Sequence, residues 1–218
     1  TAAALLGAQL GASAQQSAAP ADAAPAAEPG KLPTVTVTAE RRRENARDVP
    51  NSISVINPEQ LDAINTGGQD LRGLAGRVPN LNIESSFGRS FPRLYIRGYG
   101  NTDFRPNASQ PVSLVYDEVV QENPILKGFP AFDLDRIEVL RGPQGTLFGR
   151  NTPAGVVKFD SVQPSQEKES YVRASYGTFD TIDVKAAFGG KLTDTISARL
   201  SGVIQTRSDW IDNKYTGD

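Results

Sequence analysis

The stretch "LDRIEVLRGPQGTLFGRNTPAGVV", residues 134–157, joins a regular strand pattern to a dense run of turn residues. The glycines at positions 142, 145 and 149 raise the question of whether this is a loop that cradles phosphate. Such a loop needs the pattern G-x-x-x-x-G-K-[ST], in which a lysine reaches the terminal phosphates. Here Gly145 and Gly149 are one residue too close together, and Arg150 follows Gly149. The spacing argues against nucleotide binding, so the glycines need another explanation.

The composition excludes several classes of function. The 218 residues carry a net charge of −2, which gives no electrostatic argument for a nucleic-acid partner. Cysteine and histidine are both absent, which removes the commonest general base and the commonest ligands of transition metals. Near-neighbour carboxylates at Asp133/Asp135 and Asp117/Glu118 leave an enzyme as a formal alternative, but such pairs are more often caps or turns. We therefore expect no catalytic residues, no metal site and no cofactor.

The first 30 residues predict export followed by a flexible lead. The stretch "TAAALLGAQLGASA" is small and apolar and ends in an A-x-A pattern, as in a signal peptide that is cleaved after Ala14. The alternative is a disordered tail rich in alanine. The chain contains no methionine, so we expect sequence upstream of it. Residues 15–30 lack aromatic and β-branched side chains and cannot bury enough apolar surface to order themselves.

A strand pattern follows this lead in "TVTVT", residues 34–38, which alternates β-branched residues with period two. A single strand on a flexible lead has no neighbour to pair with. We therefore expect a segment that adds to the sheet edge of another protein. The alternative is that it forms the first strand of the domain that follows.

Residues 45–162 indicate a mixed α+β domain. Asn57, Pro58 and Gln60 fit an N-cap, a first helical position and a capping box, which predicts a helix over 58–64. Helical spacing recurs at Leu71, Leu74 and Val78 before Pro79. Strands are expected over residues 51–56, 93–98, 111–120 and 135–142, and a polar contact loop over 99–110.

The pattern changes after Glu169 to three successive amphipathic strands. In "TIDVKAAF", residues 181–188, the even positions are apolar (Ile182, Val184, Ala186, Phe188) and the odd positions include Asp183 and Lys185. The stretches "SYVRASYG" and "TISARLSGVIQ" repeat the alternation, and "GTFD" and "GGKLTD" join the three strands. Alternation of this kind is typical of transmembrane barrels, although a soluble sandwich gives the same pattern.

The motifs "TVTVTAERR", "VPNSISVI", "LYIRG", "VSLVYDEVV" and "DRIEVLRGPQGTLFGRNTPAGVV" together resemble the plug domain of TonB-dependent outer-membrane receptors. The resemblance covers residues 34–162, and the three later strands are similar to the start of the family's barrel. Two features depart from the family's pattern: Ala154-Gly155 replaces a pair of glycines, and residues 156–160 replace an isoleucine-rich strand.

The resemblance implies a signal-peptide remnant at 1–14 and a flexible lead at 15–44. An α+β plug with a mixed β-sheet and short helices would follow at 45–162, and the first antiparallel strands of a transmembrane β-barrel at 163–218. The implied function is energy-coupled uptake of a scarce ligand, most often a ferric siderophore, across the outer membrane of a Gram-negative bacterium. Alternatives are a carbohydrate, cobalamin or another organometallic ligand. A signalling receptor is disfavoured, because residues 15–33 are too short for an additional domain.

The resemblance also assigns roles to residues. Those that match the TonB box, which would pair with the TonB protein, are Thr34, Val35, Thr36, Val37, Thr38 and Ala39. Expected ligand contacts at the plug apex are Tyr99, Asn101, Asp103, Phe104, Arg105, Gln121, Asn123 and Lys127, with residues 148–152 as a further candidate loop. Arg97 and Arg141 would lock the plug to glutamates of the barrel, the alternative being exposed arginines that end strands. Tight turns are expected at Gly142, Gly145, Gly149 and Gly155.

Overall fold

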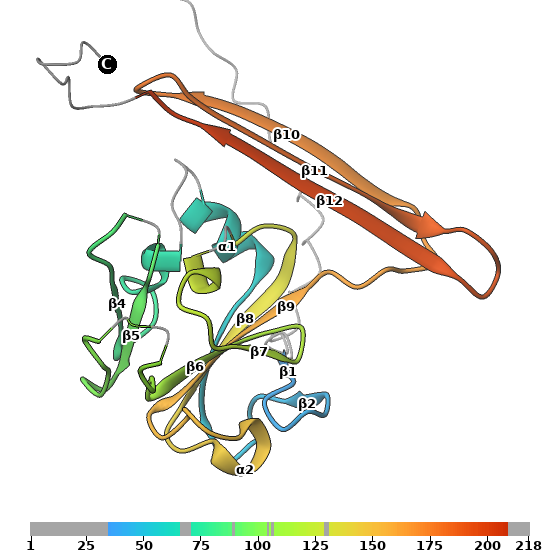
Figure 1. Ribbon diagram of the computed structural model, residues 1–218. Coiled ribbons are helices and arrows are strands. Elements are labelled where there is room, and N and C mark those ends of the chain that lie inside the picture. The colour runs from blue at the N-terminus through green and yellow to red at the C-terminus, as the bar shows by residue number, and fades with distance from the viewer. Residues whose placement is uncertain are drawn as a thin grey trace, which may run out of the picture. The chain divides into compact units, whose positions relative to one another are not determined.

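The computed structural model describes residues 35–65, 71–88, 90–103, 105, 107–128 and 131–208 (Figure 1). The expected signal-peptide remnant, most of the expected lead and Thr34 of the TonB-box match lie outside these residues. Within the described ranges, every helix is too short or too polar to cross a membrane.

A five-stranded sheet forms the centre of the plug domain (Figure 1). Its order is β3 (Ser52–Ile56), β8 (Leu134–Arg141), β9 (Gly155–Ser161), β6 (Val112–Tyr116) and β7 (Val119–Gln121). Strand β9 pairs antiparallel with β8 and parallel with β6, so the sheet is mixed, as the sequence predicted. The opening stretch of the sequence, residues 134–157, therefore supplies all of β8 and the start of the central strand β9.

Short elements surround this sheet. They are β1 (Thr36–Val37), β2 (Glu44–Asn45), α1 (Pro58–Asn65), η1 (Leu71–Leu74), β4 (Leu81–Glu84), β5 (Arg93–Ile96), η2 (Leu126–Gly128) and α2 (Gly145–Phe148). The predicted start of α1 is confirmed, because the Gln60 amide donates to Asn57 Oδ1 at 2.9 Å. In return, the Asn57 amide donates to Gln60 Oε1 at 3.2 Å, which completes a capping box.

Two predictions of secondary structure are wrong. The single strand expected over 111–120 is a hairpin, because Asp117 and Glu118 both adopt positive φ (44° and 67°) and turn the chain between β6 and β7. The helical spacing at Leu71, Leu74 and Val78 gives a short 3₁₀ helix followed by turns, with all three side chains buried. Strand β4, whose residues Leu81 and Ile83 point into the core, was not predicted from the sequence.

The two faces of the sheet are covered differently. One face packs Ile137, Val139, Val157 and Phe159 into the main core, with side chains from α1, η1, β4 and β5. The other face forms a smaller apolar cluster that contains Ala39, Val115, Leu140, Phe148 and Val156. The same face carries the buried charges Glu138 and Lys158. The chain before the sheet is therefore part of the plug's second core.

A separate antiparallel sheet contains β10 (Glu169–Gly177), β11 (Thr181–Lys191) and β12 (Ser197–Thr206). The three amphipathic strands expected after Glu169 are thus present, although β11 continues through three residues that were expected in a turn, Gly189, Gly190 and Lys191. Side chains on its apolar face are exposed, among them Val172, Tyr176, Ile182, Phe188, Leu200 and Ile204. On the other face, Asp183 and Ala187 are buried.

The backbone of β9 approaches its neighbours most closely at Gly155, and a substitution there tests this packing. Its φ is +153°, and a Cβ atom would lie 2.2 Å from the Leu140 carbonyl oxygen and 2.7 Å from Ile96 Cδ1. We expect Gly155→Ala to cost about 2–4 kcal/mol, because it adds backbone strain and a clash inside the sheet. Gly76→Ala is the matched control, since nothing lies within 4 Å of that position. Urea unfolding followed by circular dichroism measures both, and equal midpoints would contradict this packing.

Candidate functional site

The segment that matches the TonB box lies on the second face of the plug sheet. Thr36 and Val37 pair with Asn45 and Glu44 in the β1–β2 hairpin, and the side chains of Val37 and Ala39 are fully buried. This differs from the expectation of a strand without a partner in its own chain. The reason is that Ala39 completes the apolar cluster around Val115, Leu140 and Val156, which local sequence could not indicate.

Thr38 connects this segment to buried charges that lie 100 to 122 positions along the chain. Its amide donates to Glu138 Oε1 at 2.7 Å. Its hydroxyl lies 3.1 Å from the same oxygen and 3.0 Å from Asp160 Oδ2, and accepts a hydrogen bond from Lys158 Nζ at 2.6 Å. One threonine therefore joins two acidic residues and one basic residue of the sheet.

Lys158 is the cation at the centre of this cluster, with 1% of its side chain exposed. Its ammonium lies 2.7 Å from Asp160 Oδ1 and 2.8 Å from Glu118 Oε1. Burial alone would lower the pKa of Lys158, but the hydrogen bonds to Asp160 and Glu118 outweigh burial and raise it. Arg136 adds a second cation, whose Nε lies 3.3 Å from Asp160 and 3.4 Å from Glu138.

Glu138 is the least satisfied member of the cluster. It is fully buried, and among the described side chains its Oε2 is the one buried polar atom without a hydrogen-bond partner. Burial raises the pKa of the Glu138 carboxyl, although the Thr38 amide and the Lys158 charge act in the opposite direction. If residues 36–39 left the sheet, water could solvate both Glu138 and Lys158. Water would thus replace part of what Thr38 provides.

The predicted apex residues are distributed over two neighbouring loops. Tyr99 and Asn101 line an open cavity of about 270 Å³ together with Gln110 and Asn151. Tyr99 is 56% exposed, and the Asn101 side chain donates to the Ser109 carbonyl at 2.8 Å. The cavity therefore combines an aromatic ring with amide groups.

The remaining apex predictions have mainly local contacts. Arg105 and Asp103 form an exposed ion pair at 3.8 Å, and Asn123 Oδ1 accepts from the Ile125 amide at 3.0 Å. Gln121 ends β7 and Lys127 is buried in η2, while Phe104 lies outside the described residues.

Residues after α2 complete this region, and the sequence analysis gave them only as a broad range. Arg150 pairs with Glu122 through two hydrogen bonds of 3.0 and 2.5 Å, and Asn151 Nδ2 donates to Glu122 Oε1 at 3.2 Å. These contacts bring the end of the glycine-rich stretch to the loop after β7. Gln110, which lines the same cavity, had no sequence signal beyond its place in a polar loop.

The expected turn glycines have different conformations. Gly142 and Gly149 adopt positive φ (106° and 78°), and the Gly149 amide donates to the Gly145 carbonyl at 3.1 Å. Gly145 instead begins α2, and Gly155 allows the close approach of β9 to β8. These four glycines shape the backbone of the plug, and they do not form a phosphate-binding loop of the P-loop type.

The two arginines predicted to lock the plug have different surroundings. Arg141 donates to Ser52 Oγ at 3.1 Å, to Ser54 Oγ at 2.8 Å and to the Pro79 carbonyl at 3.2 Å, all within the plug. Arg97 is exposed and has a positive φ of 54°. Their pairing with barrel glutamates involves residues outside this sequence and stays a prediction.

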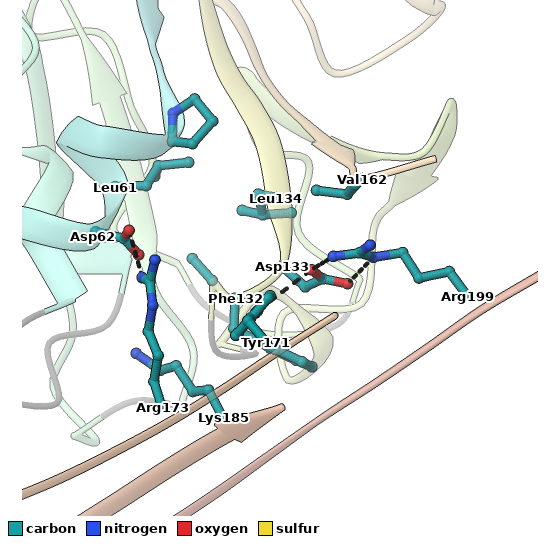
Figure 2. Close-up of a pocket in the computed structure, with 12 residues that line it drawn as sticks. Leu61, Asp62, Phe132, Asp133, Leu134, Val162, Tyr171, Arg173, Lys185 and Arg199 are labelled. Carbon is teal, nitrogen blue, oxygen red and sulfur yellow. Dashed lines mark hydrogen bonds and ion pairs between the residues drawn. The ribbon is translucent and has the colours of Figure 1, made fainter. Parts of the chain in front are cut away.

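Plug aspartates contact arginines of the three-stranded sheet (Figure 2). Arg199 of β12 holds Asp133 through two hydrogen bonds of 2.9 and 2.6 Å, and the Tyr171 hydroxyl lies 3.4 Å from the same carboxylate. Burial would raise the pKa of Asp133, but the Arg199 hydrogen bonds contribute to a net decrease. Arg173 of β10 pairs with Asp62 of α1 at 2.5 Å, with both side chains more than half exposed. In these two contacts the plug supplies the acids and the three-stranded sheet supplies the arginines.

The comparisons with known proteins agree with this architecture. The family model described as "TonB-dependent Receptor Plug Domain" matches residues 45–156, more than half of the 218 residues. The pesticin receptor of Yersinia pestis is 29% identical over 165 residues, which cover 74% of this chain and 23% of the relative. The ferric-pyoverdine 358 receptor of Pseudomonas putida is 26% identical over 187 residues, covering 84% and 22%. The chain therefore spans about a quarter of the length of these relatives.

A solved structure, the ferric yersiniabactin uptake receptor FyuA from Yersinia pestis, is also similar. Its TM-score is 0.61 at 27% sequence identity, and the match covers 69% of this chain and 24% of that one.

Thr38→Val tests whether the hydroxyl holds the N-terminal segment on the sheet. The substitution keeps the shape and the amide but removes the bonds to Lys158 and Asp160, so we expect docking to weaken by about 1–3 kcal/mol. Hydrogen exchange at the amides of Val37 and Ala39 should accelerate accordingly. Thr38→Ser keeps the hydroxyl and should exchange at nearly the wild-type rate. Unchanged exchange in Thr38→Val would show that apolar burial alone holds the segment.

Asp133→Asn and Asp62→Asn form a matched pair for the contacts in Figure 2. The Asp133–Arg199 pair is 5% and 8% exposed, so breaking it in the full-length protein should cost about 3–5 kcal/mol. Asp62→Asn should cost at most about 1 kcal/mol, because its pair with Arg173 is solvated. The stability loss of each variant is measured as the shift in the urea concentration at which the plug has lost half of its protection against protease. Equal midpoints for the two variants would contradict the difference in burial.

The same comparison has an expected pH dependence. The pKa of Asp133 is lowered below its ordinary value of 3.8, so its stabilisation is fully present above 3.8 and is lost as the pH falls through the lower folded value. The difference in the free energy of unfolding between the wild type and Asp133→Asn should therefore disappear only in strong acid.

Proposed function

Because the chain belongs to the family of TonB-dependent receptors, we propose that it serves the energy-coupled import of a ferric siderophore across the outer membrane. The family is one of transport receptors, and its members reside in the outer membrane of Gram-negative bacteria. The observation that supports coupled import best is the docking of residues 36–39 on the plug sheet, with Thr38 bonded to Glu138, Asp160 and Lys158.

The proposed role of this segment is to pair with TonB as an added strand. Strand addition uses main-chain hydrogen bonds, so it suits a segment whose side chains alternate without a strict sequence requirement. β1 contributes only two residues to its own hairpin, and Val35 is 46% exposed. A partner with a longer strand could therefore form more main-chain bonds than the segment loses on leaving β2.

Release of the segment is the step that would couple the plug to TonB. It would open the Thr38 cluster and the apolar side chains of Val115, Leu140 and Val156 to water. The apolar exposure opposes release, while hydration of Lys158 and Glu138 partly offsets it. We infer that the docked and released states differ by a few hydrogen bonds and one small apolar cluster, which a pulling partner could overcome.

The ferric siderophore is the ligand that the apex and the comparisons support. The open cavity combines the exposed ring of Tyr99 with the amides of Asn101, Gln110 and Asn151, a lining suited to a polar ligand with flat faces. Two of the similar proteins are named for ferric ligands, pyoverdine and yersiniabactin.

Val37→Pro in the full-length receptor tests the proposed coupling. Proline removes a main-chain donor from the strand that would be added to TonB, so uptake of the receptor's ferric siderophore should be abolished while ligand binding persists. Uptake of radioactive iron and equilibrium binding to outer membranes measure the two properties separately.

The control is Val35→Ala, which changes an exposed side chain and keeps every main-chain group. It should leave uptake within about a factor of two of the wild type, because strand addition depends mainly on the backbone. If Val37→Pro lost binding as completely as uptake, the segment would be a structural strand of the plug, and its role as a handle for TonB would be wrong.

A further inference from the structure

Glu138 lies in a row of side chains that crosses the second face of the plug sheet. The strand register places Val55 of β3 and Lys158 of β9 directly opposite Glu138, and Val115 of β6 opposite Lys158. Two opposite charges, 0% and 1% exposed, are thus flanked by valines. The Thr38 hydroxyl oxygen stands between them, 3.1 Å from Glu138 Oε1 and 2.6 Å from Lys158 Nζ. The docked segment therefore separates the two charges.

The ammonium of Lys158 directs its protons to groups other than Glu138. An ammonium has three N–H donors. The partners of Lys158 Nζ are Thr38 Oγ1 at 2.6 Å, Asp160 Oδ1 at 2.7 Å and Glu118 Oε1 at 2.8 Å. These three contacts use all of its donors, so the lysine that lies opposite Glu138 offers it charge but no hydrogen bond.

Two further donors are shared between Glu138 and Asp160. The single hydroxyl proton of Thr38 can go to Glu138 Oε1 at 3.1 Å or to Asp160 Oδ2 at 3.0 Å. The single proton on Arg136 Nε has the same choice, at 3.4 Å and 3.3 Å. Each donor can fully serve one carboxylate at a time. The cluster thus contains too few protons for both carboxylates, and Glu138 Oε2 receives none from the described side chains.

The charges of the cluster do not balance either. Glu118, Glu138 and Asp160 are acidic, while Arg136 and Lys158 are basic, so the five groups have a net charge of −1 when all are ionised. Glu138 is the most deeply buried of the three acids, at 0% side-chain exposure against 15% for Asp160 and 48% for Glu118. The charged form is therefore most costly at Glu138.

The elements around the cluster do not supply the missing positive charge. Strands β3, β6 and β7 and helix α2 contain no charged side chain within their bounds. Arg41 pairs with Glu118 at 3.6 Å, and Asp135 pairs with Arg136 at 3.1 Å. These two outer partners carry opposite charges, so including them leaves the balance at −1.

We propose that Glu138 is a proton-binding site whose occupancy is linked to the docking of residues 36–39. The carboxyl takes up a proton from water at Oε2 when the segment docks and returns it to water when the segment leaves. Oε2 is the oxygen without a hydrogen-bond partner, so the bond from the Thr38 amide to Oε1 stays in place. The added proton brings the net charge of the cluster to zero. This inference concerns the docking itself and does not require a partner that draws the segment out.

The direction of the pH dependence follows from burial. Burial raises the pKa of the docked Glu138 carboxyl above its ordinary value of 4.5, whereas release exposes the carboxyl to water and returns it toward that value. A group whose pKa is raised in the docked state stabilises docking through its protonated form. This stabilisation is fully present below pH 4.5 and is lost as the pH rises through the higher, docked value.

The test follows the hydrogen exchange of the Thr38 amide in the full-length receptor, without TonB or ligand, from below pH 4.5 to neutrality. The protection factor, which divides out the intrinsic exchange rate at each pH, reports docking. In the wild type it should fall by up to about tenfold per pH unit above pH 4.5 and level off once the docked carboxyl is ionised. Glu138→Gln is neutral at every pH. It should keep the protection that the wild type has in acid and show no pH dependence.

Glu40→Gln is the matched control, because it removes an acid of the same segment that pairs with Arg42 at 3.0 Å outside the cluster. It should keep the wild-type pH profile. Asp160→Asn replaces Glu138→Gln if the latter does not fold. It removes one negative charge and leaves the shared donors to Glu138, so the decline in protection should begin at lower pH.

Protection of the Thr38 amide that is constant or rises with pH in the wild type would overturn the proposal. A pH dependence that survives in Glu138→Gln, that is unshifted in Asp160→Asn, or that vanishes in Glu40→Gln would also overturn it. None of these measurements involves TonB or uptake, so their failure is distinct from failure of the proposed function.

Discussion

The ammonium of Lys158 imposes the constraint on which the rest of the plug depends. It lies on β9, the central strand of the sheet, and is almost completely buried. A buried charge is tolerated only when it is paired and hydrogen-bonded. Its partners come from three parts of the chain: Thr38 before the sheet, Glu118 in the β6–β7 turn, and Asp160 on β9 itself. Satisfying this one cation therefore fixes the N-terminal segment, a hairpin turn and the central strand relative to one another.

The alternation along β9 explains why the segment is needed. Val157 and Phe159 point into the main core, while Val156 and Lys158 point to the opposite face, where neither helix α1 nor β4 and β5 contribute to the apolar cluster. That face is closed by Ala39, Phe148 and the charged network around Thr38. A segment that could serve as a handle for a partner is thus also the cover of a small core. Its departure has an energetic cost, which is what a controlled release requires.

Local chemistry made part of this fold predictable. The capping box of Asn57 and Gln60 lies within four residues, and the alternation after Glu169 is visible in each strand separately. The β6–β7 hairpin was missed because the turn signal at Asp117 and Glu118 is weak: no glycine, asparagine or proline stands beside them, although both adopt positive φ. The Thr38 cluster could not be foreseen, since its partners lie 100 to 122 positions away. The aspartate–arginine contacts of Figure 2 were missed for the same reason: no pattern pairs Asp133 with a residue 66 positions later.

Strand β8 connects the two charged regions of the plug. Asp133, which Arg199 holds, immediately precedes the strand, and Arg136 and Glu138 within it belong to the cluster around Thr38. β8 is hydrogen-bonded to β3 on one side and to β9 on the other, with an irregularity in register only between Leu134 and Arg136. A strand paired on both sides moves as a unit, because shifting it would break ladder bonds to two neighbours. Asp133 and Glu138 are therefore linked by one strand that is paired on both sides, and the irregularity in its register, between Leu134 and Arg136, lies between them.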